Sequence, residues 1–175
     1  SIAFQRIVLS GHIMYSDEKE DHLEDTYFKE ILQNKLFECD ARRSNLGFAV
    51  ISVAYNDMHY QGHKTTANKE VFSKIYEEIH MNLSNSDIII KYGNDRILII
   101  TPDKSEKQMR ELVENLKKKS ENHIFVEKTK FRGRIKVSYG YSSFPETAET
   151  LRDIYENAYI MLHENIKVEN WLKTI

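Results

Sequence analysis

The chain has 175 residues, which suggests one domain, and 41% of them are hydrophobic, which is enough for a sizeable core. Its net charge of -2 favours neither nucleic acid nor an anionic membrane surface as a partner. One cysteine, Cys39, excludes an internal disulfide, and every apolar run is too short to cross a bilayer, so we expect a cytoplasmic domain without a membrane segment.

Residues 1–20 show no firm hydrophobic period and end in the polar, charged run Ser16–Glu20. We expect them to be a linker or the end of an upstream domain, followed by one domain over residues 21–175. Because the chain begins with serine rather than methionine, we also expect it to be a fragment of a longer protein.

The first part of this domain predicts a helix, a strand and a second helix. Apolar residues at helical spacing indicate a helix from Asp25 to about Phe37. The segment Gly47–Tyr55 is rich in valine, isoleucine and aromatic residues, as strands are. After a polar loop, the amphipathic segment Lys69–Leu83 predicts a helix with one buried face.

The clearest turn signal lies between the apolar runs Ile88–Ile90 and Ile97–Ile100. Between them stand Gly93 and Asn94, two residue types that tolerate a positive φ, so the pattern predicts a β-hairpin. Both runs are apolar without alternation, which favours two central strands in a covered sheet.

Two further helices are predicted in the second half of the chain. Ser105 and Gln108 form a capping-box pattern at the start of a helix that runs to about Lys119. The last helix is expected from Pro145–Thr147 to about His163, with apolar residues again at helical spacing.

Strands are predicted between and after these helices. Ile124–Phe131 alternates with period two, as an edge strand does, and Ile135–Ser142 follows it. Within the second strand, Gly140 indicates a bulge or a close approach of another element. The tail Val168–Ile175 is expected to add a short edge strand.

Without the flanking pieces, the predicted order is β-α-β-β-α-β. This is the ferredoxin-like arrangement, an α/β (α+β) fold with a mostly antiparallel central sheet covered by helices. Its two crossover connections are expected to be right-handed and to place the helices on one face of the sheet.

The segment KYGNDRILIITP, residues 91–102, resembles the motif segment of the GGDEF domains of diguanylate cyclases, which reads like RYGGDEFLIILP. The later segment Ile135–Pro145, with a Ser-x-Gly pattern, is similar to the late strand of that family. Lys69–Leu83 and Leu151–Leu162 are similar to two of its helices. The resemblance covers about residues 21–170 and implies the GGDEF-like variant of the ferredoxin-like fold.

The resemblance also implies a chemistry. Such cyclases join two GTP molecules into cyclic di-GMP, one per subunit of a head-to-head dimer, and two metal ions activate the attacking hydroxyl. Acids at the end of the first strand and at the hairpin tip hold these ions, because magnesium prefers carboxylate and phosphate oxygens. Here the strand ends in Ser52, Val53 and Ala54, so the first-strand acids are absent.

At the hairpin tip, the family motif is kept only in part. Gly93 matches the first glycine, Asn94 replaces the second, and Asp95 is still acidic. Arg96 and Ile97 replace the glutamate and the phenylalanine. We interpret Gly93, Asn94 and Asp95 as a vestigial turn in which Asp95 forms a salt bridge with Arg96 rather than binding a metal.

Two other family sites are also altered. Many members bind cyclic di-GMP at an Arg-x-x-Asp site before the hairpin; here Asp87 is kept, but Ser84 stands in place of the arginine that supplies the bidentate contact. The family's last helix carries a lysine and an arginine for phosphates, and His163 and Lys167 stand near those places. Asp87 is therefore a vestigial product-site residue.

Four other groups of residues are weighed against ordinary structural roles. His59 and His63 could face one metal ion on a helix, but they lie in a predicted loop, and Cys39 has no predicted partner. The basic residues Lys128, Lys130, Arg132 and Arg134 suggest a solvated hairpin rather than a nucleic-acid strand. Tyr139 and Tyr141 share one strand face and could line an interaction surface.

We therefore expect a catalytically inactive GGDEF-like domain, with no catalytic residue, metal or cofactor. It would act as a regulatory or protein-interaction module in a larger bacterial signalling or envelope-associated protein, whose full length could be membrane-anchored. Its partner would be another protein, a neighbouring domain or a second copy of the chain. Two alternatives stay open: a receptor for cyclic di-GMP or GTP through a remodelled site, and an active nucleotide cyclase of altered specificity.

Overall fold

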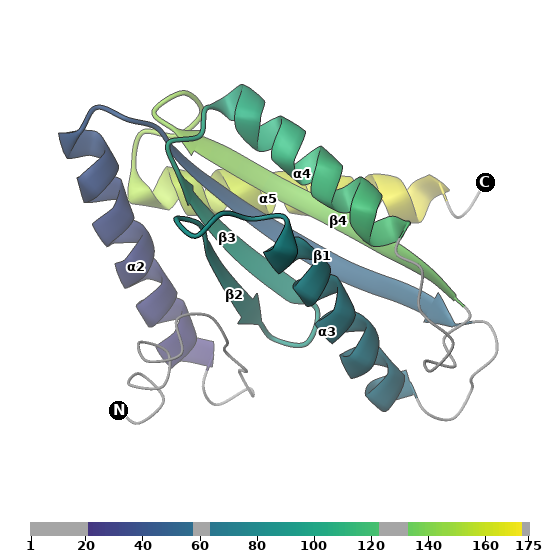
Figure 1. Cartoon of the computed structure of the whole chain (residues 1–175). Coiled ribbons are helices and arrows are strands. Elements are labelled where there is room, and N and C mark those ends of the chain that lie inside the picture. Colours follow the sequence, from purple (N-terminus) through teal and green to yellow (C-terminus); the bar gives the residue numbers. More distant parts are fainter. Residues whose placement is uncertain (1–20, 58–63, 123–132, 173–175) are drawn as a thin grey trace.

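The computed structural model describes residues 21–57, 64–122 and 133–172 (Figure 1). Their helices and strands alternate along the chain in the predicted β-α-β-β-α-β order, with one extra helix at each end. In chain order they are α2 (Asp21–Ala41), β1 (Leu46–Asp57), α3 (Lys64–Met81), β2 (Ile88–Tyr92), β3 (Arg96–Pro102), α4 (Glu106–Glu121), β4 (Gly133–Phe144) and α5 (Leu151–Leu172).

The four described strands form one sheet in the order β2-β3-β1-β4, and every neighbouring pair is antiparallel. This confirms the predicted fold class. The hairpin prediction is confirmed as well, since β2 and β3 pair directly. The expectation that both hairpin strands are central is wrong, because β2 is an edge strand of the described sheet. It reads as apolar because helices cover its faces: Ile89 is 3% exposed and Ile90 is 6% exposed.

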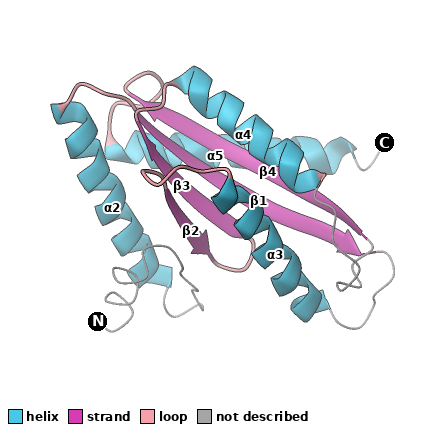
Figure 2. Ribbon diagram, in the orientation of Figure 1, coloured by secondary structure: helices cyan, strands magenta, loops and turns pink. Residues whose placement is uncertain are grey.

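Helices cover both faces of the sheet, not one as the sequence analysis expected (Figure 2). The crossover helices α3 and α4 lie on one face, as the ferredoxin-like topology requires. The flanking helices α2 and α5 cover the other face. This second layer explains why the central residues of β1 and β3 are apolar on both faces of the sheet. Ile51 belongs to the first core cluster, and the preceding residue, Val50, belongs to the second.

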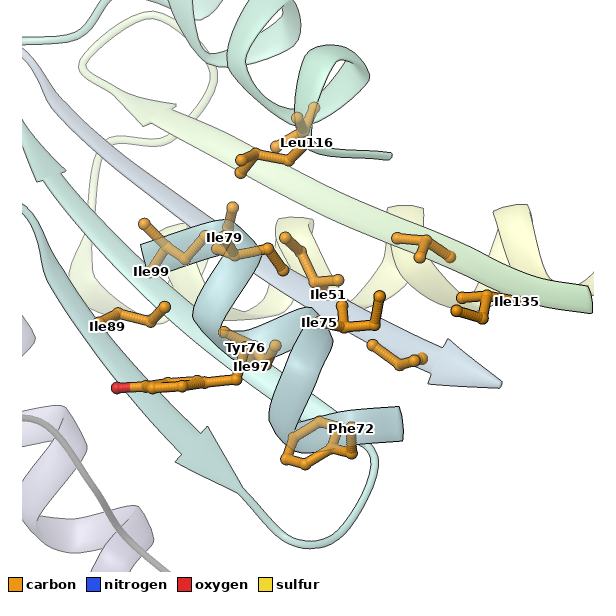
Figure 3. Close-up of a cluster of buried hydrophobic side chains, with 14 of the residues drawn as sticks. Ile51, Phe72, Ile75, Tyr76, Ile79, Ile89, Ile97, Ile99, Leu116 and Ile135 are labelled. Atoms are coloured by element: carbon orange, nitrogen blue, oxygen red, sulfur yellow. The ribbon is translucent and has the colours of Figure 1, made fainter. Parts of the chain in front are cut away.

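Isoleucine is the most frequent residue in the core beneath α3 and α4 (Figure 3). Ile75 and Ile79 from α3 are fully buried against Ile51, Ile97 and Ile99 from the two central strands. Burying one such side chain contributes about 1.5–3 kcal/mol. The hairpin strands and the first strand are therefore held together by the core rather than by the turn.

On the opposite face, aromatic rings join α2, β1 and α5. The ring centroid of Phe28 lies 5.3 Å from that of Phe48 and 6.0 Å from that of Tyr155. Helix α5 also packs directly on β4 at Gly140, where an added Cβ would lie 1.7 Å from the carbonyl oxygen of Ala158. The prediction of a close approach at Gly140 is thus confirmed.

Several element boundaries differ from the prediction. Helix α3 begins at Lys64, within the expected polar loop, and α2 continues to Ala41. Helix α5 continues to Leu172, so the expectation of an edge strand is wrong for residues 168–172. The predicted strand over residues 124–131 and the N-terminal segment 1–20 lie outside the described residues.

The predicted capping box of α4 is confirmed. The Ser105 hydroxyl oxygen accepts a hydrogen bond from the Gln108 backbone nitrogen at 3.3 Å, and the Gln108 side-chain oxygen accepts one from the Ser105 nitrogen at 2.9 Å. None of the helices in the described part of the chain is long and apolar enough to span a membrane.

Candidate functional site

The hairpin tip and the Ser52–Ala54 segment of the first strand lie side by side in the structure, although β1 itself continues to Asp57. The backbone nitrogen of Val53 donates a hydrogen bond to the carbonyl oxygen of Asp95 at 2.8 Å. The antiparallel register of β1 and β3 also places Ser52 directly opposite Arg96. The two segments that the family resemblance assigns to one site therefore lie next to each other, since the central strands bring them together.

The turn at the hairpin tip has a positive φ at Gly93, as its sequence predicts, but not at Asn94. Gly93 has a φ of 66°, in the left-handed region that glycine adopts without strain. A Cβ at this position would meet only an oxygen of Asp95, at 3.7 Å, so the backbone angle and not crowding favours glycine. Asn94 and Asp95 are exposed at the tip.

Arg96 turns away from the tip and packs on helix α5. Its guanidinium carbon lies 5.5 Å from the ring centroid of Tyr159, which is a cation–π contact. Within the described ranges no ion pair joins Arg96 to Asp95, so the predicted salt bridge at the turn is wrong. The reason is strand geometry: Ile97 points into the core beneath α3 and α4, so Arg96 points to the face that α5 covers.

The residues of β1 beside the hairpin tip do not fit the pair of magnesium ions that the family resemblance implies, although β1 continues beyond them to Asp57. Ser52 offers a neutral hydroxyl and Ala54 offers no ligand atom, whereas magnesium prefers carboxylates. The one acid of the vestigial turn, Asp95, is next in sequence to a permanent cation, Arg96. Within residues 21–57, 64–122 and 133–172 no three His, Cys, Asp or Glu side chains gather as a metal-binding group.

The vestigial product site is a closed turn. The Asp87 carboxylate accepts a hydrogen bond from the Ser84 backbone nitrogen at 2.9 Å and another from the Ser84 hydroxyl at 3.0 Å. The Asp87 nitrogen in turn donates to the Ser84 carbonyl oxygen at 3.1 Å. Ser84, at the position where the resemblance implies an arginine, thus binds Asp87, and the two residues stabilise the turn that leads into β2.

The candidate phosphate residues of the last helix lie on its exposed surface. His163 and Lys167 are both exposed on α5, and the His163 ring centroid lies 6.3 Å from that of Tyr159. Tyr159 is also the residue on which Arg96 packs. The structure therefore places His163 one helical turn beyond the contact between α5 and the hairpin.

The sequence analysis missed a buried lysine in β2. Lys91 is 6% exposed, and its ammonium lies 4.6 Å from the ring centroid of Tyr76 and 5.8 Å from that of Phe72. Burial lowers the pKa of Lys91, and the negative charge of Glu77 opposes part of this shift. The available signal was its position between isoleucines and a tyrosine inside a predicted strand.

Tyr139 and Tyr141 do not form an exposed surface. Tyr139 is half-buried and Tyr141 is buried, and the Tyr141 hydroxyl donates a hydrogen bond to the Glu106 carboxylate at 2.9 Å. Burial and the bond to Glu106 raise the pKa of Tyr141 to about 12. These tyrosines therefore join β4 to α4.

The remaining candidates have ordinary surroundings or lie outside the described residues. Cys39 is fully buried, with an Arg42 nitrogen 3.8 Å from its sulfur. The structure does not describe the candidate residues His59, His63, Lys128, Lys130 and Arg132. For Arg134 it describes the backbone but not the side chain.

Comparison with known families gives one match that covers most of the chain. The family described as diguanylate cyclase, GGDEF domain, matches residues 24–169. A comparison with curated protein sequences finds no significant match.

Several solved structures have the same fold. The GGDEF domain of FimX from Pseudomonas aeruginosa aligns with a TM-score of 0.68 at 14% identity, over 81% of this chain and 87% of that chain. The GGDEF domain of DgcB from Caulobacter crescentus, solved in complex with c-di-GMP, aligns with a TM-score of 0.67 at 16% identity, over 82% of both chains. The diguanylate cyclase SiaD from Pseudomonas aeruginosa, in complex with its activator SiaC, aligns with a TM-score of 0.64 at 15% identity, over 81% of this chain and 54% of that chain.

Proposed function

Because the chain belongs to the GGDEF domain family of diguanylate cyclases, we propose that it is a catalytically inactive member of that family. In this proposal the domain is a regulatory and protein-interaction module in bacterial cyclic di-GMP signalling. The observation that carries it is the pair of residues opposite each other in β1 and β3, Ser52 and Arg96.

The charge at this place is the reverse of what two bound metal ions require. The resemblance places metal-binding acids at Ser52 or Ala54 and at the position of Arg96. Arginine stays protonated at any physiological pH, so its charge repels a divalent cation instead of offsetting it. Without metal ions, the attacking hydroxyl of GTP loses its activation and the triphosphate loses its charge neutralisation.

The altered product site supports the same proposal. The planar guanidinium that would contact guanine or phosphate is absent, and both hydrogen bonds to the Asp87 carboxylate come from Ser84. A ligand at this site would have to break that turn. The remainder of the domain keeps two complete hydrophobic layers, so the changes are confined to the sites and leave the scaffold intact.

A domain with this scaffold can bind a protein partner without any catalytic residue. The related cyclase SiaD, of which this chain covers 54%, is seen in complex with its activator protein SiaC, which supports a protein partner for this chain. For this chain, the partner would be another protein, a neighbouring domain or a second copy. The proposed location is the bacterial cytoplasm, in a longer signalling protein.

The test of inactivity is synthesis of cyclic di-GMP by the purified chain from GTP, with magnesium or manganese, beside an active GGDEF domain as positive control. We expect no product. Any product formed in proportion to the chain's concentration would overturn the proposal. A matched triple variant, Ser52→Asp, Ala54→Asp and Arg96→Glu, restores the acids, and we expect it to bind GTP only when magnesium is present.

Nucleotide binding without catalysis is tested separately by calorimetry. At about 100 μM protein, titration with cyclic di-GMP or with GTP would reveal any affinity near the micromolar range, which is about 8 kcal/mol. We expect no heat of binding from either ligand. A saturating isotherm that Ser84→Ala or Arg96→Met abolishes would replace the interaction module with a nucleotide receptor.

A further inference from the structure

Two cations from different parts of the fold pack on neighbouring tyrosines of helix α5. The Lys29 ammonium of α2 lies 5.3 Å from the ring centroid of Tyr155, and the Arg96 guanidinium carbon of β3 lies 5.5 Å from that of Tyr159. The two rings are themselves in contact, with their centroids 4.5 Å apart. We refer to Lys29, Tyr155, Tyr159 and Arg96 as the cation–tyrosine stack.

The stack joins elements that are distant along the chain. Lys29 lies in the first described helix, the tyrosines lie in the last, and Arg96 begins β3 directly after the hairpin tip. The two tyrosines are one helical turn apart, so α5 holds them in a fixed relation. A displacement of α2 that moves Lys29 therefore changes the surroundings of Tyr155. Tyr155 in turn contacts Tyr159, the ring on which Arg96 packs.

A second contact keeps α2 in place against the same ring. Phe28 is 2% exposed and packs on both Tyr155 and Phe48. Its anchoring belongs to the core and does not depend on charge. Lys29 is exposed, so its ammonium adds an interaction with Tyr155 that can be removed without opening the core.

We propose that α2 and the hairpin tip are energetically coupled through the cation–tyrosine stack, which makes it a route by which the position of α2 affects the vestigial turn. The proposal does not depend on whether the domain is a catalyst, because it concerns packing between three elements. Each cation–π contact of this kind contributes about 0.5–1 kcal/mol when it is exposed, which is enough to shift a local opening equilibrium.

The hydrogen bond from the Val53 nitrogen to the Asp95 carbonyl oxygen, at 2.8 Å, is the natural reporter. It closes the hairpin tip onto β1 and lies beside Arg96 in the register. Local opening of the tip exposes the Val53 amide to exchange with solvent. The amide of Ile99, in the fully buried part of β3, reports on global unfolding instead.

The experiment measures amide hydrogen exchange by NMR in the whole chain and in its Lys29→Met variant. We expect exchange at Val53 to become about two- to fivefold faster, as loss of one cation–π contact implies, with exchange at Ile99 unchanged. The matched control is Lys35→Met on the same helix, because Lys35 forms an ion pair with Glu38 of α2 itself at 3.1 Å. It should leave Val53 unchanged.

Arg96→Met provides the decisive background. If the stack transmits the effect, Lys29→Met adds nothing to the exchange rate of Val53 once Arg96 has been replaced. The proposal is overturned if Lys29→Met leaves Val53 unchanged, or if it accelerates Val53 and Ile99 equally. It is also overturned if the two substitutions multiply independently.

Discussion

The carboxylate of Asp87 accepts two hydrogen bonds from one residue, Ser84, through its backbone nitrogen at 2.9 Å and its hydroxyl at 3.0 Å. The acid that the family resemblance assigns to ligand binding is thus used to stabilise the turn before β2. An Asp side chain that caps a turn in this way replaces solvent with fixed donors and limits the conformations of the loop.

The contribution of this turn can be measured by denaturant unfolding. We expect Asp87→Ala to lower the free energy of unfolding by about 1–2 kcal/mol, because two side-chain hydrogen bonds are lost, and Ser84→Ala to lower it by about half as much. The neighbouring exposed residue Asn85 offers the matched control, and Asn85→Ala should change little. Equal losses for all three variants would mean that the bonds to Asp87 do not stabilise the fold.

Substitutions at two glycines should destabilise the fold by different amounts and for different reasons. An alanine at Gly140 would place its Cβ 1.7 Å from the Ala158 carbonyl oxygen, so α5 would have to move away from β4. We expect Gly140→Ala to cost at least about 3 kcal/mol. At Gly93 the space is open and only the φ of 66° is unfavourable, so Gly93→Ala should cost about 1–2 kcal/mol.

The comparison of these variants by thermal or chemical unfolding has a clear control. Asparagine tolerates the left-handed region better than alanine does, so Gly93→Asn should be less destabilising than Gly93→Ala. At Gly140 the larger asparagine should be no better than alanine. If Gly140→Ala were as mild as Gly93→Ala, the close approach of α5 would be wrong.

The sequence was sufficient for the hairpin and for the meeting of its tip with the first strand. Gly93 and Asn94 between two apolar runs have a local physical meaning, and the β-α-β-β-α-β order then requires β3 to pair with β1. The position of Ser52 opposite Arg96 in the sheet follows from that pairing. Local chemistry and topology therefore account for the hairpin and for its place beside β1, whereas only the family resemblance marked these two segments as parts of one site.

What the side chains of the site do could not be read from sequence. Arg96 was expected to pair with Asp95 next to it, but a residue 63 positions later, Tyr159, provides its contact. That choice depends on α5 covering the second face of the sheet, which the ferredoxin-like pattern alone does not require. The burial of Lys91 likewise depends on α3 lying over β2 with Phe72 and Tyr76.

The bond between Tyr141 and Glu106 predicts a late tyrosine titration. Burial and this bond raise the pKa of Tyr141 to about 12, above the usual 10.0. The unfolded chain therefore loses its proton at lower pH than the folded chain. The stability due to the protonated phenol is fully present below pH 10.0 and is lost as the pH rises through about 12.

Tyr141→Phe removes both the hydrogen bond to Glu106 and the titrating phenol. At pH 7 we expect it to lower the free energy of unfolding by about 0.5–1.5 kcal/mol, the usual value of one hydrogen bond. Above pH 10 the difference from the parent chain should shrink, because phenylalanine does not titrate. Glu106→Gln is the matched control, since it removes the charge but keeps an acceptor for the hydroxyl. Tyrosinate absorbance that rises fully by pH 10 would contradict the assigned burial.

The last prediction concerns Lys91, whose effect on the pH dependence of stability has the opposite sign to that of Tyr141. Burial lowers its pKa below the 10.5 of an exposed lysine, more than Glu77 raises it. Between the folded and unfolded pKa values the unfolded chain binds more protons, so stability rises with pH across that window. Below the folded pKa the full cost of burying the ammonium is present, although the rings of Tyr76 and Phe72 offset part of it.

Lys91→Met keeps the length of the side chain and removes the charge. We expect this variant to be more stable than the parent chain at pH 7, and its advantage to decrease as the pH rises through the window between the lowered pKa of the folded lysine and the usual 10.5. Denaturant unfolding at a series of pH values from 7 upwards measures both quantities. The exposed Lys107 on α4 provides the control, since Lys107→Met lacks a buried charge to remove and should show neither effect. A Lys91→Met variant that is less stable at pH 7 would show that the aromatic contacts outweigh the cost of burial.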